Sequence, residues 1–229
     1  TTLFRSLTDV VTEGLPSVEI IPMRVDIDEK EHLYGPGGDI SVSEFYAALR
    51  AGSYAKTASI NPLVYHETFG SYLEKGLDII YLCFSSGLSG TIDNAKLAIE
   101  SLKEEYPERK ILCVDTLCAS VGEAFLVLEA LRKQKEGLTI EELYAWVLEH
   151  RLKVCHWFTV DTFEHLHRGG RVSAAAAAAG TVLQIKPLLH VDKEGKLIVA
   201  DKPRGRKRAT ARQLSKLEQG RTPEFGRLI

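Results

Sequence analysis

Apolar residues along the chain follow two patterns: short unbroken runs, and stretches in which they recur every three or four positions. Unbroken runs at 77–83 (LDIIYLC) and 110–116 (KILCVDT) are typical of strands buried on both faces of a parallel sheet. A helical period follows each run, over 91–106 and 122–137. Strand and helix therefore alternate, which predicts an α/β fold with a parallel sheet and right-handed crossovers.

The helical period also predicts helices over 40–52, 64–76 and 138–153. Ser41 or Ser43 is the expected N-cap of the first of these helices. The third opens with Thr139, and Glu142 follows three residues later, which is the signature of a capping box.

Three stretches of the N-terminal half lack a helical period. The stretch 17–28 is rich in Val and Ile and predicts a strand, which Pro22 disturbs. Residues 34–39 (YGPGGD) predict a loop, and 56–62 (KTASINP) form a polar segment before the next helix.

From about residue 153 the pattern changes. It predicts a strand at 154–160, partial helix over 161–180 broken at Gly169–Gly170, a hairpin over 187–202 turning at Glu194–Gly195, and a helix at 208–220. We place a domain boundary near residue 152. The prediction is an N-terminal α/β domain, 1–152, and a smaller second α/β domain, 153–229.

Composition narrows the class of protein. Of 229 residues, 45% are hydrophobic and 26% are charged, which is typical of a globular protein, and the net charge of −2 gives no general attraction to nucleic acid or membranes. The four cysteines show no CxxC spacing, which favours a reduced, cytoplasmic protein without a zinc site. No apolar run is long enough to span a bilayer.

The first candidate site is SSGLSGT, residues 85–91, where a buried strand passes into a helix. Ligands bind at this position in open α/β sheets, and the start of a helix offers free N–H groups to an anion. Hydroxyl donors come from Ser85, Ser86, Ser89 and Thr91, and Gly90 allows close approach to the backbone. An ordinary helix cap needs one serine, so the density of donors favours a ligand. A P-loop is excluded because Gly-Lys-[Ser/Thr] is missing.

A serine hydrolase is the alternative at the same place. Residues 87–91 match the first part of G-x-S-x-G, with Ser89 as nucleophile, although Thr91 replaces the final glycine. The histidines downstream that could serve as its base are His156, His165, His167 and His190.

The polar segment 56–62 is the second hydroxyl cluster. Ser59 or Asn61 can cap the helix that Pro62 begins, and this leaves the hydroxyl of Thr57 without a structural task.

The second domain offers basic residues around glycines. Arg168 and Arg171 flank Gly169–Gly170 and suit contact with a phosphate or carboxylate, although a solvated turn explains them about equally well. The run 202–209 (KPRGRKRA) includes Arg204 and is either a solvated turn or a docking site for a phosphate-handling partner or nucleic acid. The alanine run 174–179 either permits close helix packing or leaves room for an apolar ligand.

Taken together, KTASINP, SSGLSGT, VDTLCASVGEAFLVLEA, HLHRGGRVS with IKPLLHVDKEGKL, and KPRGRKRA resemble the DegV family, the fatty-acid-binding subunits of bacterial fatty acid kinase. The resemblance covers about 17–209. It implies two α/β domains that hold a long-chain fatty acid such as palmitate, without a metal or other cofactor. The carboxylate then lies on the hydroxyls of Thr57 and Ser89, with Ser59, Ser86 and Gly90 beside them, and the acyl chain enters a tunnel in the second domain.

The resemblance also implies a partner. A separate kinase subunit phosphorylates the bound carboxylate to an acyl phosphate for phospholipid synthesis, and Arg168, Arg171 and Arg204 are the expected contacts with the kinase or the phosphate. The protein is then a binding subunit and not the enzyme, binds no nucleic acid, and contacts membranes transiently at most.

Two features depart from the family pattern. The family opens with a strand and an Asp-Ser-Thr loop, and residues 1–11 show no such motif. The family also continues well beyond the basic run, so we expect the second domain to be incomplete.

Overall fold

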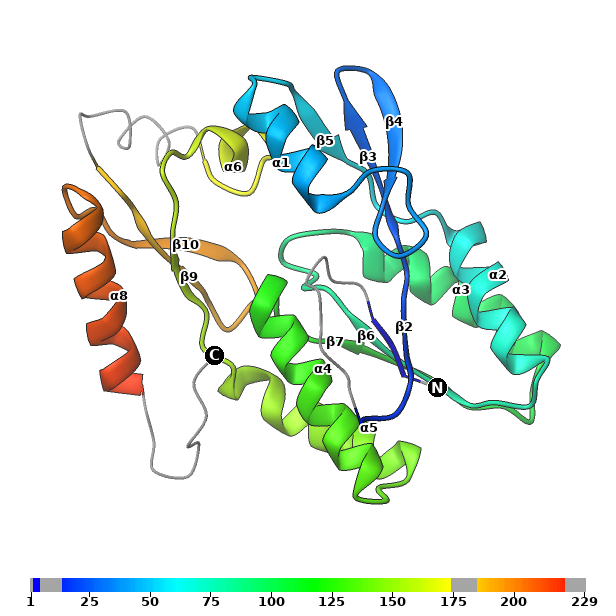
Figure 1. Cartoon of the computed structure of the whole chain (residues 1–229). Coiled ribbons are helices and arrows are strands. Elements are labelled where there is room, and N and C mark those ends of the chain that lie inside the picture. The colour runs from blue at the N-terminus through cyan, green and yellow to red at the C-terminus, as the bar shows by residue number, and fades with distance from the viewer. Residues whose placement is uncertain (1, 5–13, 174–184, 221–229) are drawn as a thin grey trace. The chain divides into compact units, whose positions relative to one another are not determined.

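The computed structural model describes residues 2–4, 14–173 and 185–220, and the chain forms two compact units, 1–151 and 152–229 (Figure 1). We call them unit 1 and unit 2 and describe each by itself. The alanine run at 174–179 lies outside the described residues.

Unit 1 contains a parallel sheet in the order β2-β1-β6-β7. Its strands are β1 (Thr2–Phe4), β2 (Val18–Ile20), β6 (Ile79–Cys83) and β7 (Ile111–Asp115). Strands β6 and β7 pair in parallel from Ile79↔Ile111 to Cys83↔Asp115. All five residues of β6 are buried, as the unbroken apolar run predicts. The predicted α/β fold with a parallel sheet is confirmed.

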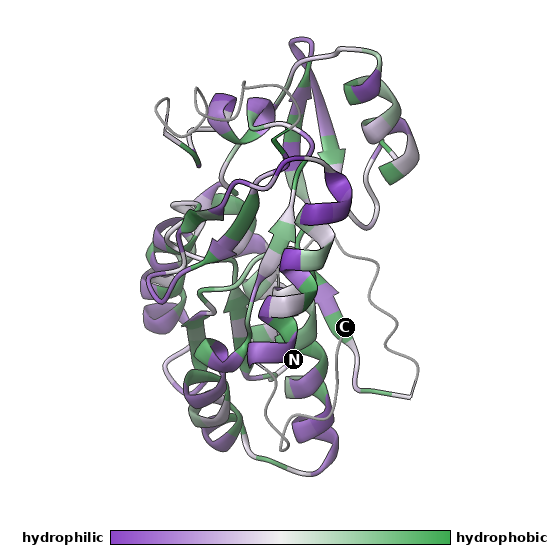
Figure 2. Cartoon of the chain, turned by 90° about the vertical axis from the view of Figure 1, so that its left-hand side faces the viewer, coloured by the Kyte–Doolittle hydropathy of each residue, from purple (hydrophilic) through white to green (hydrophobic). Residues whose placement is uncertain are grey.

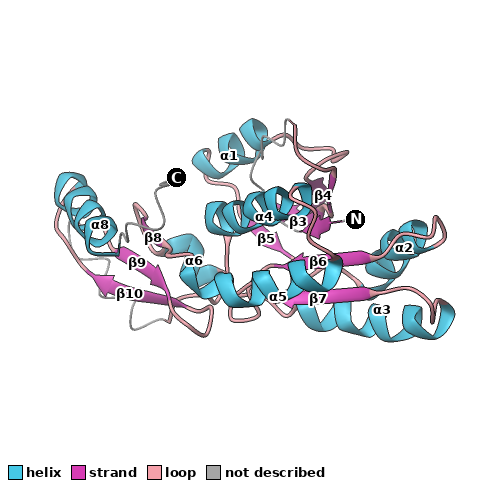
Figure 3. Cartoon of the chain, turned by 90° about the horizontal axis from the view of Figure 1, so that it is seen from below, coloured by secondary structure: helices cyan, strands magenta, loops and turns pink. Residues whose placement is uncertain are grey.

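Helices cover this sheet on both faces. They are α2 (Pro62–Leu73), α3 (Thr91–Glu105), α4 (Ser120–Lys135) and α5 (Ile140–His150). Ile79, Tyr81 and Cys83 of β6 share one core with the buried faces of α2 and α3. Because side chains alternate along a strand, Ile80 and Leu82 point to the opposite face, where α5 contacts β6 and β7 (Figure 3).

The helix ends follow the predicted capping chemistry. Helix α1 (Val42–Arg50) and helix α5 both start with a capping box, Ser41 with Glu44 and Thr139 with Glu142. Asn61 caps α2 through a hydrogen bond from Leu63 N–H to Oδ1, and Pro62 is the first helical residue.

The prediction of one strand over 17–28 is wrong. Pro22 separates β2 from β3 (Met23–Ile27), and β3 belongs to a small antiparallel sheet in the order β4-β3-β5. Strand β4 (Lys30–Tyr34) is joined to β3 by a turn at Asp28 and Glu29, whose φ angles are +49° and +68°. Positive φ at both central positions is the mark of a type I′ hairpin turn, and the charged sequence at residues 28–30 (DEK) lacks the Asn-Gly or Asp-Gly pair that usually indicates one.

Two further strands escape the sequence pattern. Strand β5 (Ala55–Thr57) overlaps the start of the segment 56–62, which the sequence indicates as polar, and it pairs with β3 through Val25↔Thr57. Strand β1 has only three residues, yet it lies between β2 and β6. Such short strands are held by backbone pairing with their neighbours, so their own side chains carry little periodic signal.

Unit 2 contains an antiparallel sheet in the order β10-β9-β8. Its elements are β8 (Trp157–Thr159), α6 (Glu164–Arg168), β9 (Leu188–Val191), β10 (Leu197–Asp201) and α8 (Arg206–Gly220), after a 3₁₀ turn at Arg151–Lys153. The predicted hairpin is confirmed: Asp192 Oδ1 accepts from Lys196 N–H at 2.8 Å, and Gly195 has φ +73°. Hydrophobic colouring covers several of the strands, and hydrophilic and hydrophobic residues alternate along the helices (Figure 2).

Candidate functional site

Two loops meet where β6 and β7 end. We call residues 84–90 the site loop and residues 116–119 the β7 loop. The carboxyl ends of parallel strands lie at one edge of a sheet, so both loops emerge there. Ser85 N–H donates to Cys118 O at 3.0 Å, and Thr116 N–H donates to Cys83 O at 3.1 Å. The site loop is therefore bound to its neighbour through the backbone.

Ser85 builds the turn inside the site loop. Its side chain is fully buried, and its Oγ accepts from Gly87 N–H at 3.2 Å. Its carbonyl oxygen accepts from the N–H groups of Leu88 and Ser89 at 3.1 and 3.2 Å. Ser85 thus has a structural task, while Ser86 and Gly90 are exposed and Ser89 is half-buried.

The site loop ends at the start of helix α3. Gly90 is the N-cap and provides no side-chain hydrogen bond, while Ser89 Oγ accepts from Thr91 N–H at 3.3 Å. Because a hydroxyl donates as well as accepts, Ser89 can still offer its proton to a ligand. The positive end of the dipole of this 15-residue helix favours an anion here. Ser89 is therefore partly a cap and partly a free donor.

The second hydroxyl segment is fixed to the first turn of α3. Asn94 Nδ2 donates to Ile60 O at 2.8 Å and to Ser59 Oγ at 3.4 Å, and Ile60 N–H donates to Thr91 Oγ1 at 3.4 Å. The fold thus brings Ser59 beside the helix that the site loop begins. Thr57, two residues earlier, is exposed at the end of β5, and within the described part of the chain its hydroxyl makes no hydrogen bond.

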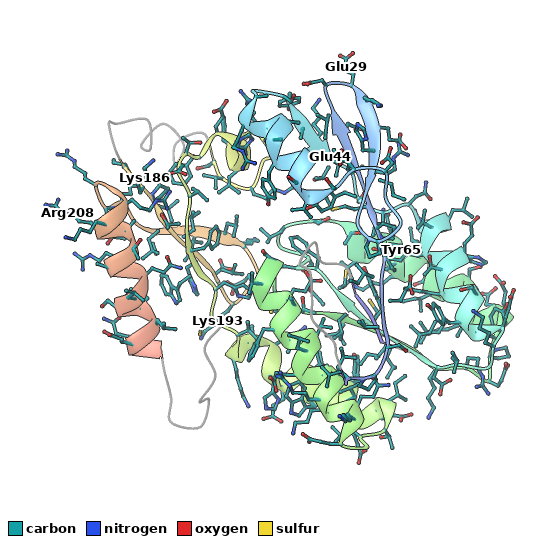
Figure 4. All side chains as sticks on the ribbon, viewed as in Figure 1. Glu29, Glu44, Tyr65, Lys186, Lys193 and Arg208 are labelled. Atoms are coloured by element: carbon teal, nitrogen blue, oxygen red, sulfur yellow. The ribbon has the colours of Figure 1, made fainter. Side chains whose placement is uncertain are left out.

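A buried group of hydroxyls lies beneath these segments. Tyr65 OH lies 2.9 Å from Tyr81 OH and 2.8 Å from Thr91 Oγ1, and all three side chains are fully buried (Tyr65 is labelled in Figure 4). Burial raises the pKa of Tyr81 well above its usual value, so its phenol stays neutral. Sequence reasoning missed this group; the available signal was a tyrosine inside the apolar run of β6.

The contacts of Ser89 do not support the alternative of a serine hydrolase. Within the described residues, no histidine hydrogen-bonds Ser89, whose neighbours are the backbone groups of Ser85 and Thr91. A nucleophilic serine needs a base within hydrogen-bond reach. The surroundings of Ser89 suit binding better than nucleophilic attack.

The predicted arginines all lie in unit 2. Arg168 pairs with Glu164 in α6, and Arg171 Nη1 donates to Gly169 O. Arg204 is exposed next to an isolated bridge with Ile185. Arg171 is thus engaged with the turn around Gly169–Gly170, Arg168 is paired within α6, and Arg204 is exposed to solvent.

The side chain of Arg206, in the basic run, binds another segment of unit 2. Arg206 and Lys186 both bind the carboxylate of Asp161, with Lys186 Nζ at 2.9 Å, and these two cations hold the pKa of that carboxyl below its usual value. Arg208 extends from α8 away from the sheet (Figure 4). The run 202–209 is therefore partly structural and partly a solvated face.

The described residues were also compared with the requirements of a metal site, a disulfide and a membrane span. Over residues 2–4, 14–173 and 185–220, no cluster of three or more His, Cys, Asp or Glu side chains could hold a metal ion. None of the four cysteines, all of which lie in the described ranges, forms a disulfide, and burial raises the pKa of the Cys113 thiol to about 12. None of the described helices combines the length and the apolarity needed to cross a membrane.

The family model described as "Uncharacterised protein, DegV family" matches residues 12–228. A DegV domain-containing protein of Clostridium perfringens is 41% identical over 194 residues, which is 85% of this chain and 67% of that protein. The chain belongs to the DegV family, so the resemblance carried by its motifs is confirmed.

Solved structures agree on the fold. A DegV family protein from Thermus thermophilus, described as fatty acid binding, aligns with a TM-score of 0.79 and 30% identity over 96% of this chain and 77% of its own. The fatty acid kinase B3 protein of Streptococcus pneumoniae, loaded with linoleic acid, aligns with a TM-score of 0.83 over 95% of this chain and 78% of its own. At 20% identity, that second likeness is one of fold.

Proposed function

We propose that this protein binds a long-chain fatty acid and holds its carboxylate on the hydroxyls of Thr57 and Ser89, with Ser59, Ser86 and Gly90 completing the contact. The observation that carries the proposal is the joining of two hydroxyl-rich segments at the glycine-capped start of α3, through Asn94 and Thr91. Fatty acid binding by the DegV protein of Thermus thermophilus supports the ligand class.

The physical chemistry of the site suits one carboxylate better than a nucleotide. A carboxylate buried with an apolar tail is very costly unless donors surround it, and hydroxyls with helix N–H groups supply such donors without a metal. Residues 85–91 contain no lysine, the residue that nucleotide-binding phosphate loops use. Each buried CH₂ of the tail contributes about 0.8 kcal/mol, so the tail dominates affinity and the head group sets orientation.

The proposal assigns the acyl chain to a tunnel in the second domain, residues 153–229, and the carboxylate to the first, residues 1–152. It also assigns a partner kinase, which converts the bound carboxylate to an acyl phosphate for phospholipid synthesis in the bacterial cytoplasm. Arg168, Arg171 and Arg204 are then contacts for the kinase or the phosphate. The chain itself is the binding subunit and transfers no phosphate.

Lipid analysis tests the binding step. The purified protein is extracted with organic solvent and the extract is examined by mass spectrometry, and delipidated protein is then titrated with palmitate. We expect a co-purified fatty acid or stoichiometric uptake. An empty extract together with no uptake contradicts the proposal.

A trapping assay tests the kinase step. Loaded protein is incubated with ATP, a fatty acid kinase catalytic subunit and hydroxylamine, which converts an acyl phosphate into a hydroxamate. Hydroxamate is expected only when the kinase is present. Product without the kinase would make the chain itself an enzyme, and no product with the kinase would remove the partner from the proposal.

A further inference from the structure

Asp115 connects the two loops at the carboxyl end of the sheet. It is the last residue of β7, opposite Cys83 of β6. Its Oδ1 accepts from Ser86 N–H in the site loop at 3.1 Å and from Leu117 N–H in its own loop at 3.1 Å. One carboxylate oxygen therefore fixes both loops at once.

The surrounding contacts make this connection rigid. Thr116 Oγ1 donates to Cys83 O at 2.6 Å, and Thr116 is fully buried. Leu117 has φ +54°, a left-handed conformation that a side chain of this kind rarely adopts. The hydrogen bond from Leu117 N–H to Asp115 stabilises this turn, and the turn presents Cys118 O to Ser85 N–H at 3.0 Å.

We propose that Asp115 is a positioning residue for the ligand site: by holding Ser86 N–H, it sets the conformation of the site loop in which Ser86, Ser89 and Gly90 face the carboxylate. This inference rests on the proposed function. Asp115 acts through the site loop, and the task depends on an oxygen acceptor at the Oδ1 position. A neutral amide oxygen in the same place performs the same task.

A control residue exists at the opposite end of the same strand pair. Asp78 precedes β6, and its Oδ1 accepts from Lys110 N–H, which precedes β7, at 3.0 Å. Asp78 thus makes the same kind of hydrogen bond between the chain segments of β6 and β7. It does so at the amino ends of these strands, whereas the site loop lies at their carboxyl ends. Its removal reports the general cost of such a bond.

Three variants of Asp115 are compared with Asp78→Ala by calorimetric titration with palmitate and by thermal unfolding. We expect Asp115→Ala to weaken palmitate binding about tenfold, since it removes two hydrogen bonds to one acceptor. Asp115→Asn keeps the acceptor and restores affinity to near that of the parent. Asp115→Ser can still hold Leu117 N–H but is too short for Ser86 N–H, so it folds and binds as weakly as Asp115→Ala.

The outcomes separate this inference from the proposed function. A parent protein that takes up no fatty acid contradicts the proposed function itself. If the parent binds and Asp115→Ala or Asp115→Ser binds as tightly as Asp78→Ala, the positioning role is wrong. Equal weakening by Asp115→Asn and Asp115→Ala would also overturn it, since the amide retains the acceptor.

Discussion

At both ends of the strand pair β6–β7, an aspartate accepts a hydrogen bond from a backbone N–H of the neighbouring segment. At the amino end, Asp78 binds Lys110 N–H, and the side chain of Arg109 beside it donates to Gly76 O at 2.6 Å. At the carboxyl end, Asp115 binds Ser86 N–H among neutral hydroxyls at the start of α3.

The difference lies in the donors around each aspartate. Each end has a cation beside its aspartate: Arg109 Nη1 lies 3.9 Å from Asp78 Oδ1, and Arg151 Nη1 donates to Asp115 O at 2.6 Å. At the carboxyl end, hydroxyls and a glycine-capped helix start can still donate. An aspartate that accepts a backbone N–H therefore does not by itself indicate a ligand site. The indication comes from the hydroxyl and N–H donors at the start of α3 that remain available to a ligand.

The largest expected effect is on ligand affinity at the carboxyl end. Thr57→Ala and Ser89→Ala should each weaken fatty acid binding by about 1–3 kcal/mol, because each removes a hydroxyl from a desolvated carboxylate. Titration calorimetry with palmitate measures the change. Ser101→Ala, an exposed position near the end of α3, is the matched control and should bind like the parent. Parent-like binding by both site variants would remove the head-group assignment.

A smaller effect concerns the buried hydroxyls beneath the site. Tyr65→Phe removes the group that contacts both Tyr81 OH and Thr91 Oγ1, and it should lower the free energy of unfolding by about 1–2 kcal/mol. Tyr72→Phe, on the same helix, loses one bond to Glu19 at a half-buried position and should cost less. Denaturant titration compares the two variants. An equal loss in the free energy of unfolding would show that the buried hydroxyl group of Tyr65 contributes no more than the half-buried one of Tyr72.

The smallest expected effect is on the free energy of unfolding and comes from Asp161 of unit 2. Unlike Asp78 and Asp115, which accept hydrogen bonds from backbone N–H groups, Asp161 binds two side-chain cations. Its carboxyl pKa is lowered by hydrogen bonds from Lys186 and Arg206. A pKa below the unfolded value contributes stability above that value and loses it as pH falls through the folded pKa. The parent should therefore be slightly more stable than Asp161→Asn at neutral pH, with the difference shrinking as the pH falls below about 4 and disappearing below the lowered folded pKa.

Thermal unfolding at several pH values tests this expectation. Because Asp161 is exposed, the difference should also shrink in high salt. A difference that persists at low pH would mean that the ion pairs are not its source.

The sequence predicted the parts of the fold whose signal is local. The apolar runs of β6 and β7, the buried face of α3, the N-cap at Ser41 and the capping box at Thr139 all follow from residues close in sequence. Strands β1, β4 and β5 could not be predicted from the pattern, because backbone pairing with neighbouring strands defines them. Pro22 also concealed that its two flanking strands enter different sheets.

The candidate site divides in the same way. Ser89 and Ser59 could be chosen from the density of hydroxyls, since that density is visible in sequence. Asn94, Tyr65 and Asp115 could not, because each acts across about 25 to 35 residues of chain through contacts that only folding creates. The roles of Thr57, Ser89 and the arginines of unit 2 remain predictions for measurement.

We propose that the hydroxyls of Thr57, at the end of β5, and Ser89, at the carboxyl end of the β6–β7 pair, recognise a carboxylate. The most direct measurement titrates delipidated parent and a Thr57→Ala/Ser89→Ala double variant with palmitate and with the alcohol of equal chain length. A Ser101→Ala/Thr210→Ala protein, changed at exposed positions of α3 and α8, serves as control. We predict that the parent and the control prefer the acid and that the double variant loses this preference while still binding the alcohol. An unchanged preference for the acid in the double variant would contradict the account.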